Sequence, residues 1–366
     1  MRVLVLGGYG LIGSSISRAL MAEGHSVTGL ARSAKKGRAL IAGAQWIGAD
    51  ISKLTQAENW HSHLDGIDAV VNASGALQNG LLDNLKALQQ DAIIALIKAC
   101  EQKGTARFIQ ISAPDAVLTS QTEFYRTKAA ADAALKKSTL RWTVFRPALV
   151  ISPQAYGGTS LVRMLAAFPW GQPIILGQAP IQTVFIDDVA GAVTLAIKDD
   201  IVGVDVDLAE QGSQSLQDLT LSLRQWLGFP APRMVWHFPR WGGSIIAFFA
   251  DIAGWLGWRP ALRSTALKVI AEGVRGDAAP WTALSKTRNK SFAQTLQAMP
   301  STVQERIYAR AMLVFPLLLL TLAGFWIASG VIGLWQQSAA VTKLEGAMPP
   351  SLASLFVLSG LSLIHI

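Results

Sequence analysis

The chain has 366 residues, enough for one large domain or two of medium size with a proper hydrophobic core. Hydrophobic residues make up 51% of it and charged residues only 15%, which is more apolar than a typical soluble enzyme. The net charge of +8 comes without a basic stripe interleaved with aromatic residues, so we expect no nucleic acid partner. The single cysteine, Cys100, excludes an internal disulfide. The histidines show no ligand spacing with carboxylates or cysteines, so we expect no metal site.

Short apolar runs alternate with helical stretches along residues 1–150. The apolar runs predict strands at Val3–Leu6, Ser26–Leu30, Ala44–Ile47, Ala69–Asn72, Arg107–Ser112 and Trp142–Arg146. The stretches between them predict helices near Leu11–Glu23, Thr55–His63, Asp83–Gln102 and Thr122–Lys137. Apolar strands that alternate with helices are typical of a parallel sheet covered on both faces. We therefore predict an α/β fold in which residues 1–150 form a doubly wound Rossmann domain.

A glycine-rich turn follows the first strand directly and opens the first helix. Gly7, Gly10 and Gly13 have the spacing G-x-x-G-x-x-G. Glycine permits the tight turn, lets the backbone approach a pyrophosphate, and lets the helix pack closely on the strand. The exposed N–H groups of the turn and of the helix start at Leu11 and Ile12 then hold the phosphates. The sequence therefore predicts a dinucleotide site at this turn.

The end of the second strand indicates which dinucleotide is bound. An acidic residue about 20 positions after the turn would hold the ribose 2′-hydroxyl of NAD. Between Glu23 and Asp50 the chain has no acidic residue, and the strand instead leads into Arg32, Lys35 and Lys36. Arg32 is well placed to pair with a 2′-phosphate, so we expect NADP in preference to NAD.

Beyond Pro147, frequent glycine and proline residues indicate a smaller lobe over a binding cleft, which we assign to residues 151–235. A helix is expected after Asp187-Asp188, then a strand at Val204–Leu208 and a helix near Leu216–Leu227. The two aspartates have the appearance of a catalytic dyad. At the start of a helix, however, they serve more simply as a cap and as partners of the helix dipole.

Residues 236–305 are predicted to form a tryptophan-rich interfacial linker. Residues 226 to 281 contain half of the 12 tryptophans of the chain. Within them, residues 244–255 carry a single charge and are flanked by Arg240-Trp241 and Trp258-Arg259. This composition suits a helix at a membrane interface, and equally a lid helix packed on the Rossmann domain.

Residues 306–366 are predicted to form a membrane region. No charged residue occurs from Ala311 through Thr342, and about 20 apolar residues suffice to cross a bilayer. We expect one transmembrane helix at about 311–335 and a second from about 351 that is cut short at Ile366. Basic residues before the first span place residues 1–310 in the cytoplasm, which predicts a protein of the bacterial inner membrane.

Several motifs in order resemble the atypical or extended branch of the short-chain dehydrogenase/reductase superfamily. The matching residues are Gly7/Gly10/Gly13, Asp50-Ile51, Asn72-Ala73-Ser74-Gly75, Ser112, Arg146-Pro147 and Phe185-Ile186-Asp187-Asp188-Val189-Ala190. The resemblance covers about residues 1–230. It implies that Asp50 and Ile51 contact the adenine, and that the turn from Asn72 through Ala73 and Ser74 to Gly75 lines the ribose and nicotinamide.

The same resemblance implies a catalytic pair, a tyrosine followed four residues later by a lysine on one helix. In that family the lysine lowers the tyrosine pKa and holds the nicotinamide ribose, while the tyrosine donates or accepts the proton. Here Lys128 and Ser112 match the family, but the residue four positions before Lys128 is Phe124, which has no hydroxyl. Tyr125 lies about 100° further around the helix and serves only if the helix slips by one residue.

Two hypotheses about function follow. The first is a membrane-anchored, NADP-preferring oxidoreductase or epimerase-like enzyme whose substrate is small or lipid-like and is reached near the bilayer surface. The second is a nucleotide-binding subunit without turnover, similar to the short-chain-like accessory subunit of respiratory complex I, with the cofactor structural or a redox sensor. A minor third reading is an NADPH sensor that binds partner proteins. The tail resembles the DoxX-like module of bacterial membrane proteins, which implies contact with membrane lipid and with a membrane-protein partner.

Overall fold

The computed structural model describes residues 1–80, 84–255, 260, 262–336, 342, 349 and 351–352. The chain forms two units, Met1–Val303 and Gln304–Ile366, and each is described by itself. The division inside the first unit between residues 1–150, 151–235 and 236–305 stays a prediction.

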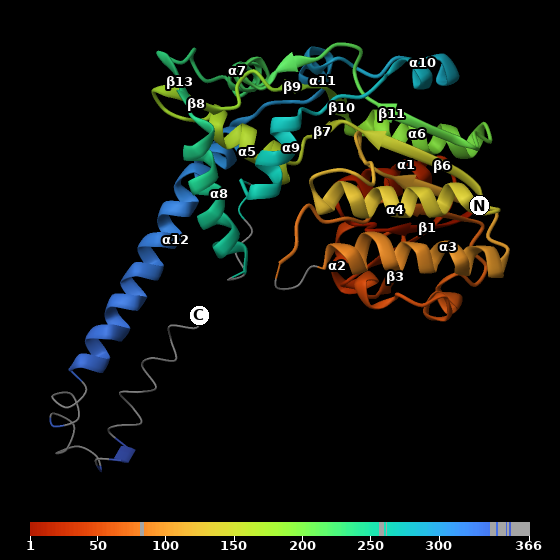
Figure 1. Cartoon of the computed structure of the whole chain (residues 1–366), viewed down its shortest axis with the longest axis horizontal. Coiled ribbons are helices and arrows are strands. Elements are labelled where there is room, and N and C mark those ends of the chain that lie inside the picture. The colour runs from red at the N-terminus through yellow and green to blue at the C-terminus, as the bar shows by residue number, and fades with distance from the viewer. Residues whose placement is uncertain are drawn as a thin grey trace. The chain divides into compact units, whose positions relative to one another are not determined.

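A parallel sheet between layers of helices organises the first unit (Figure 1). It has seven strands in the order β11-β6-β5-β4-β1-β2-β3. Its strands are β1 (Arg2–Leu6), β2 (Ser26–Ala31), β3 (Gln45–Gly48), β4 (Ala69–Asn72), β5 (Arg107–Ile111), β6 (Arg141–Pro147) and β11 (Val204–Leu208). Every neighbouring pair is parallel. The strand order reverses between β1 and β4, and ligands of such sheets bind at the carboxyl ends of the strands beside that reversal. The predicted Rossmann fold class is confirmed.

Helices cover both faces of the sheet, as the continuous apolar strands require. On one face, α1 (Leu11–Ala22) and α6 (Ile186–Lys198) bury apolar side chains against the sheet together with Trp281. On the other face lie η2 (Ala57–His63), α3 (Ala92–Lys103) and α4 (Glu123–Lys137). The helix predicted at Asp83–Gln102 instead comprises a π-helical segment, η3 (Lys86–Asp91), and then α3.

Several short helices were not predicted, and α2 (Ala34–Leu40) is the one nearest the glycine turn. This helix follows β2 directly, and its first turn is capped by the Ser33 side chain, which accepts a hydrogen bond from Lys36 N. The segment is short and basic, so it offers little of the apolar periodicity from which a helix is predicted. The short helix η1 (Ile51–Lys53) likewise begins at an aspartate cap, Asp50.

The remainder of the first unit is built from short elements. They are β7 (Leu149–Ile151), α5 (Gly157–Ala166), β8 (Gly171–Ile175), β9 (Pro180–Ile181), β10 (Thr183–Phe185), β12 (Gln214–Ser215), α7 (Leu216–Trp226), β13 (Met234–Phe238), α8 (Arg240–Trp255), α9 (Ser264–Glu272), α10 (Ala279–Ser285) and α11 (Phe292–Ala298). The region from residue 236 to residue 303 belongs to this unit. Within it, β13 pairs with β8, and Trp281 of α10 packs against Phe145 of β6 with ring centroids 5.2 Å apart.

The second unit contains the helix α12 (Val303–Trp335) from its second residue onward. It begins earlier than the predicted 311–335, because residues 303–310 are mostly good helix formers. By length and composition, Val303–Ile332 is apolar enough to cross a membrane, with a mean hydropathy of 2.3. The second predicted membrane helix, from about residue 351, lies almost wholly outside the described residues.

Candidate functional site

The three glycines of the first turn are each held by close backbone contacts. Gly7 has a positive φ of 67°, and its N–H donates to Leu30 O at 2.9 Å. A Cβ on Gly7 would lie 3.0 Å from Ala73 O, and a Cβ on Gly13 would lie 2.3 Å from Gly7 O. A Cβ on Gly10 would also meet Gly7 O, at 3.1 Å. The turn therefore accepts only glycine at Gly7 and Gly13, and it is packed against the segment that follows β4.

The start of α1 presents hydrogen-bond donors at this turn. Gly10 is its N-cap and is exposed, and no side chain caps the helix. The first N–H groups of a helix have no intrahelical acceptor, so those of Leu11 and Ile12 are directed towards the mouth of the turn. The helix also contributes its partial positive charge there. This arrangement suits a pyrophosphate.

Basic and aromatic side chains surround the end of β2. Arg32 is exposed and follows the last residue of this strand. The Lys36 ammonium lies 5.5 Å from the centre of the Tyr9 ring, which in turn lies 5.8 Å from the ring of Trp46. An ammonium over an aromatic ring is attracted by the ring's electrons. Lys36 thus stands beside Tyr9 of the glycine turn, and Arg32 directly follows the strand whose Leu30 O accepts from Gly7 N.

The Trp46 ring packs against three glycines of this region. This contact was not predicted from the sequence. A Cβ on Gly29 would lie 2.5 Å from the Trp46 ring, and a Cβ on Gly37 would lie 2.2 Å from it. A Cβ on Gly8 would lie 3.3 Å from the same ring. The signal in the sequence was the presence of glycines outside the phosphate motif, inside a strand and a helix where glycine is unfavourable.

Asp50 and Ile51 follow β3 as the resemblance expected, but their side chains are engaged within the protein. One Asp50 oxygen accepts from Ser52 N at 3.1 Å and from Ser52 Oγ at 2.8 Å. Ile51 is buried in the core between the sheet and α3. A contact of Ile51 with adenine would therefore come from its backbone.

The turn after β4 is shaped by its own side chains. The Asn72 amide donates to Gln110 Oε1 at 2.9 Å, while Asn72 Oδ1 accepts from Ser74 N at 3.1 Å and from Ser74 Oγ at 2.6 Å. The turn leads to Gly75, where a Cβ would lie 3.8 Å from Lys128 Nζ. The turn after β4 thus connects two parts of the site. It contacts the glycine turn through Ala73 and Ser74, and it lies near Lys128 at Gly75.

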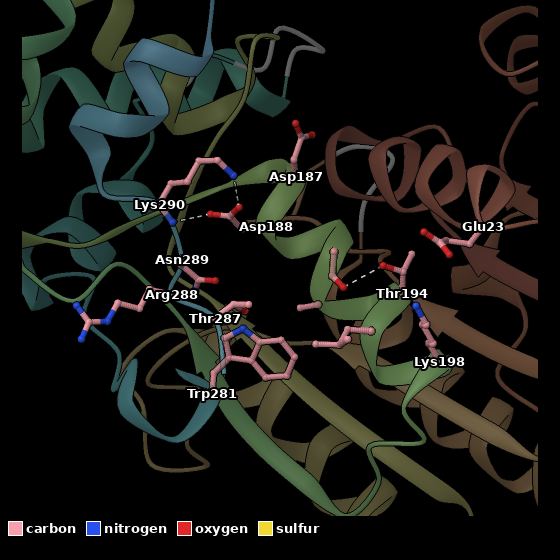
Figure 2. Close-up of a pocket in the computed structure, with 13 residues that line it drawn as sticks. Glu23, Asp187, Asp188, Thr194, Lys198, Trp281, Thr287, Arg288, Asn289 and Lys290 are labelled. Carbon is pink, nitrogen blue, oxygen red and sulfur yellow. Dashed lines mark hydrogen bonds and ion pairs between the residues drawn. The ribbon is translucent and has the colours of Figure 1, made fainter. Parts of the chain in front are cut away.

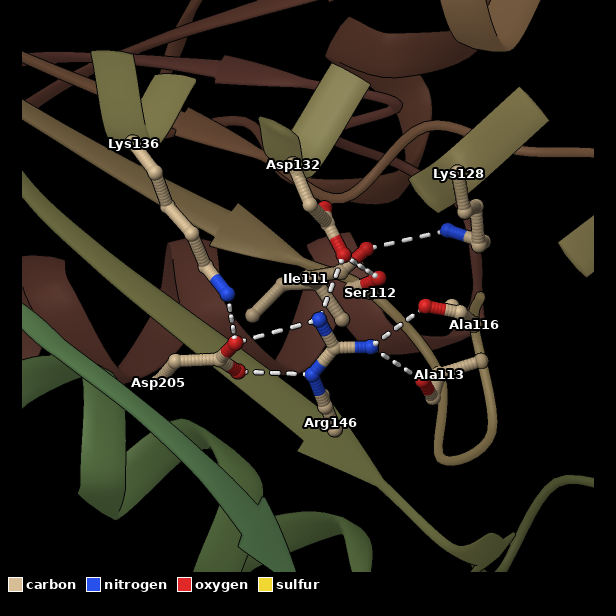
Figure 3. A network of polar contacts seen from close by, with 9 residues as sticks. All are labelled: Ile111, Ser112, Ala113, Ala116, Lys128, Asp132, Lys136, Arg146 and Asp205. Carbon is tan, nitrogen blue, oxygen red and sulfur yellow. Dashed lines mark hydrogen bonds and ion pairs between the residues drawn. The ribbon is translucent and has the colours of Figure 1, made fainter. Parts of the chain in front are cut away.

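Lys128 is fully enclosed in the fold. Its Nζ donates to Ile111 O at 3.0 Å (Figure 3). The same atom lies 5.8 Å from the centre of the Phe124 ring. Burial lowers the pKa of Lys128 to about 8, although the charge of Asp132 opposes the shift. Phe124 lies one helical turn before Lys128, so the side chain nearest the ammonium there is an aromatic ring without a hydroxyl.

Tyr125 points into a different environment. Its ring is buried in a small apolar cluster with Ala113, Ala116 and Ala129. Burial, followed by the nearby carboxylates of Asp115 and Glu272, raises the pKa of its hydroxyl above the usual value. Helix α4 brings Lys128 to the turn after β4, and it places Tyr125 in this cluster.

The Ser112 hydroxyl belongs to a buried polar network. It donates to Asp132 Oδ2 at 2.5 Å, and the same oxygen lies 3.0 Å from Arg146 Nη2. Arg146 also pairs with Asp205, with Nε 2.6 Å from Oδ1, and donates to the backbone oxygens of Ala113 and Ala116 (Figure 3). The network joins α4, β6 and β11.

Both carboxylates of this network have basic partners. Asp132 pairs with Arg146, and Asp205 pairs with Arg146 and Lys136. Burial raises the pKa of Asp132, although the bond from Ser112 and the charge of Arg146 act in the opposite direction. Burial acts the same way on Asp205, but hydrogen bonds from Arg146 and Lys136 hold its pKa below the usual value. Sequence reasoning singled out Arg146 only as part of a motif and missed Asp132. The available signal was its place one helical turn after Lys128.

Two cavities lie outside this cofactor edge. One, of about 420 Å³, lies beside α6, and there Asp188 accepts from Lys290 N and Lys290 Nζ, both at 2.7 Å (Figure 2). Asp187 and Asp188 thus stand in the first turn of α6 as dipole partners, but neither caps it. The other, of about 520 Å³, lies beside Arg146 and Asp205. Among the described residues, no group of three His, Cys, Asp or Glu side chains is arranged to hold a metal ion.

Comparisons with known proteins bear on the cofactor. Residues 7–165 match the model of an NAD(P)H-binding family. An uncharacterized chloroplastic protein of Arabidopsis thaliana is 26% identical over 224 residues, which is 54% of this chain and 72% of that protein. The photosystem II assembly factor Ycf39 of Synechocystis is 31% identical over 147 residues, 40% of this chain and 44% of that protein. The chain thus spans less than half the length of that assembly factor.

Solved structures bear on the fold. UDP-glucose 4-epimerase of Thermus thermophilus, in complex with NAD, has a TM-score of 0.60 at 18% identity, covering 84% of this chain and 99% of that one. The Bordetella bronchiseptica enzyme WbmH, in complex with NAD⁺, has a TM-score of 0.61 at 14% identity, covering 85% and 97%. Identities this low establish the fold alone. The chain therefore has an epimerase-like Rossmann fold, and its residues 7–165 are similar to an NAD(P)H-binding family, as the motifs predicted.

Proposed function

We propose that this protein is a membrane-anchored, NADP-preferring nucleotide-binding protein that holds its cofactor without tyrosine-dependent turnover. The observation that carries the proposal is the Phe124 ring, 5.8 Å from Lys128 Nζ, in the position where a reductase of this fold needs a tyrosine hydroxyl. The two other candidate proton carriers are engaged elsewhere. Tyr125 is buried among alanines, and the Ser112 hydroxyl donates to Asp132.

The similarity to Ycf39 supports an accessory role. The Ycf39 proteins are photosystem II assembly factors, and two of them match 147 residues of this chain at 29–31% identity. In the proposed function, the bound cofactor stabilises a conformation that a membrane-protein partner recognises. Cofactor redox state then changes partner binding, and no substrate is converted.

The preference for NADP rests on the cations beside the glycine turn. Arg32 directly follows β2, and no acidic residue comes after it before Asp50 to hold an unphosphorylated ribose. Guanidinium pairs with phosphate through two parallel hydrogen bonds, which favours the 2′-phosphate of NADP.

Membrane anchoring rests on α12, whose span Val303–Ile332 is long and apolar enough to cross a bilayer. The basic residues before it favour a cytoplasmic Rossmann domain at a bacterial inner membrane, by the positive-inside rule. A DoxX-like arrangement of further membrane helices belongs to the same proposal.

A second candidate is an oxidoreductase or epimerase-like enzyme that acts on a small or lipid-like substrate. The observation that favours it is Lys128, whose pKa of about 8 allows its ammonium to exchange a proton near neutral pH. In that case Lys128 takes over proton transfer, and Ser112 would have to leave Asp132 to bind a substrate oxygen. Tyr125 would have to leave its cluster to contribute.

The experiment uses the full-length chain in detergent or lipid nanodiscs. NADPH and NADH are titrated by fluorescence, and cofactor oxidation is then followed with a panel of carbonyls and quinones. We expect saturable NADPH binding without turnover, and a gain of carbonyl reduction in Phe124→Tyr that the control Phe124→Leu lacks. Turnover by the unmodified chain that is lost in Lys128→Met would establish the enzyme instead. Absence of binding by either cofactor would overturn both candidates.

A further inference from the structure

Helix α8 carries a continuous apolar face that the rest of the described chain leaves exposed. The residues of this stripe recur at helical spacing and are Trp241, Ile245, Phe248, Phe249, Ile252 and Trp255. Trp241 is 69% exposed, Phe249 64% and Trp255 57%. Single exposed apolar side chains are ordinary, but six along one face of a helix mark a contact surface.

The opposite face of α8 is made of small residues and is closely packed. A Cβ on Gly243 would lie 3.0 Å from Ile175 Cδ1, and a Cβ on Gly254 would lie 2.7 Å from Arg263 Cζ. Ala247 on the same face is buried. Bulky side chains would not fit on this face, so the helix cannot rotate to bury its aromatic stripe.

Polar bonds fix the helix further. Asp251 accepts from Gln78 Nε2 at 2.6 Å and from Arg263 Nε at 3.2 Å. The pKa of Asp251 is held below its usual value by hydrogen bonds from Ser264, Gln78 and Arg263, against the effect of its partial burial. The outward direction of the stripe is therefore a built feature of the fold.

We propose that the stripe of α8 docks on the surface of an anionic lipid bilayer, with the helix lying in the headgroup layer. Tryptophan stands at both ends of the stripe, and this residue prefers the membrane–water interface. Between Trp226 and Trp281 the chain has six Lys or Arg and three Asp or Glu, an excess of positive charge that suits an anionic leaflet. Arg240 starts the helix directly beside the stripe.

The place of α8 in the chain supports a bilayer as its occupant. The apolar span of α12 begins at Val303, the last residue of the unit that contains α8. A span inserted in a bilayer keeps this unit at the membrane surface, where an interfacial helix gains from its apolar contacts. The inference rests on the proposed anchoring by α12, and the experiment below separates the two.

Docking of α8 would orient the cofactor edge towards the membrane. Gln78 and Asn79 belong to the loop that continues from the turn Asn72–Gly75, and Gln78 is the residue bonded to Asp251. Asn79 in turn donates to Glu123 at the start of α4, the helix of Lys128. A bilayer under α8 would thus lie beside the loop that borders the cofactor site.

The test places an environment-sensitive fluorophore on the stripe of the full-length chain. Phe249→Cys and Phe248→Cys are labelled in turn, and Leu284→Cys on α10, another exposed apolar position, is the matched control. The natural Cys100 does not interfere, because burial raises the pKa of its thiol to about 12. The proteins are reconstituted in vesicles of phosphatidylcholine and phosphatidylglycerol that contain nitroxide-labelled lipid, and vesicle flotation reports the anchoring.

We expect both stripe labels to be quenched at least about threefold more than the label at position 284, and less so when phosphatidylglycerol is omitted. Flotation with equal quenching at positions 249 and 284 would overturn docking of α8 while leaving the anchoring intact. Loss of flotation would overturn the anchoring itself. Two other outcomes would also refute the inference. Cross-linking of two chains through position 249 would show that a second copy occupies the stripe, and shielding of the label from lipid by the C-terminal segment would show that this segment occupies it.

Discussion

The glycine turn allows a sharp test through a matched pair of glycine-to-alanine changes. Gly13 and Gly191 both lie in helices, in α1 and α6, where alanine is favoured over glycine by about 1 kcal/mol. They differ in surroundings. A Cβ on Gly13 would lie 2.3 Å from Gly7 O, whereas a Cβ on Gly191 meets nothing within 4 Å.

The expected magnitude follows from this difference. An ordinary contact of this kind begins near 3.4 Å, so Gly13→Ala must move the turn and α1 apart by about 1 Å. Overpacking of this kind costs about 1–3 kcal/mol, and this is the expected difference between the two variants in the free energy of unfolding. The displaced turn should also lose at least one charge-assisted hydrogen bond to the phosphates. That loss, about 1.5–3 kcal/mol, raises the Kd for NADPH about 10- to 100-fold.

The assay is a fluorescence titration with NADPH, together with equilibrium unfolding of the detergent-solubilised chain without cofactor. Gly191→Ala should bind as the unmodified protein does and be slightly more stable. Normal binding by Gly13→Ala would refute the assignment of the phosphates to this turn. Equal loss of binding in both variants would show that the effect is not local to Gly7.

Three further predictions concern single side chains. Arg32→Ala should weaken NADPH binding about tenfold or more while leaving NADH binding nearly unchanged, and Lys35→Ala is the control in the same titration. Lys128 has its pKa lowered from 10.5 to about 8, so between these values the unfolded chain binds a proton that the folded chain does not. Stability should therefore rise by about 3 kcal/mol across that window, and unfolding curves of Lys128→Met should lack the rise. Asp132→Asn should lower the free energy of unfolding by about 1.5–3 kcal/mol, because Arg146 loses a charged partner; Asp65→Asn, at an exposed ion pair with Lys103, should change it much less.

The sheet and the phosphate turn were predictable because their signals are local. Strands buried on both faces read as continuous apolar runs, and β4 (Ala69–Asn72) was predicted to the residue. The glycine turn is likewise contained in seven consecutive positions, with its strand before it and its helix after it. Such features need no knowledge of long-range contacts.

The supports of the site were not predicted, because the contacts that form them join distant segments and the local sequence signals do not identify the partners. Trp46 lies under Gly29 and Gly37, and nothing in the spacing of these residues reveals that contact. The Arg146 network joins α4, β6 and β11, which become neighbours only through the strand order. Helix α2 was missed for another reason, since its signal is a Ser33 cap inside a basic segment.

The buried network also explains how binding and catalysis can be separated in this fold. In the part of the chain that the structure describes, the Ser112 hydroxyl donates its hydrogen bond to Asp132, and Asp132 forms an ion pair with Arg146. Freeing Ser112 for a substrate would leave a buried carboxylate short of a donor, which carries a penalty of about 1–3 kcal/mol. The phosphate turn bears no such constraint, because its donors are backbone N–H groups at the open start of α1. In the proposed function the chain would retain its cofactor through the turn although Phe124 offers no proton donor, and this is why cofactor affinity and turnover must be measured separately.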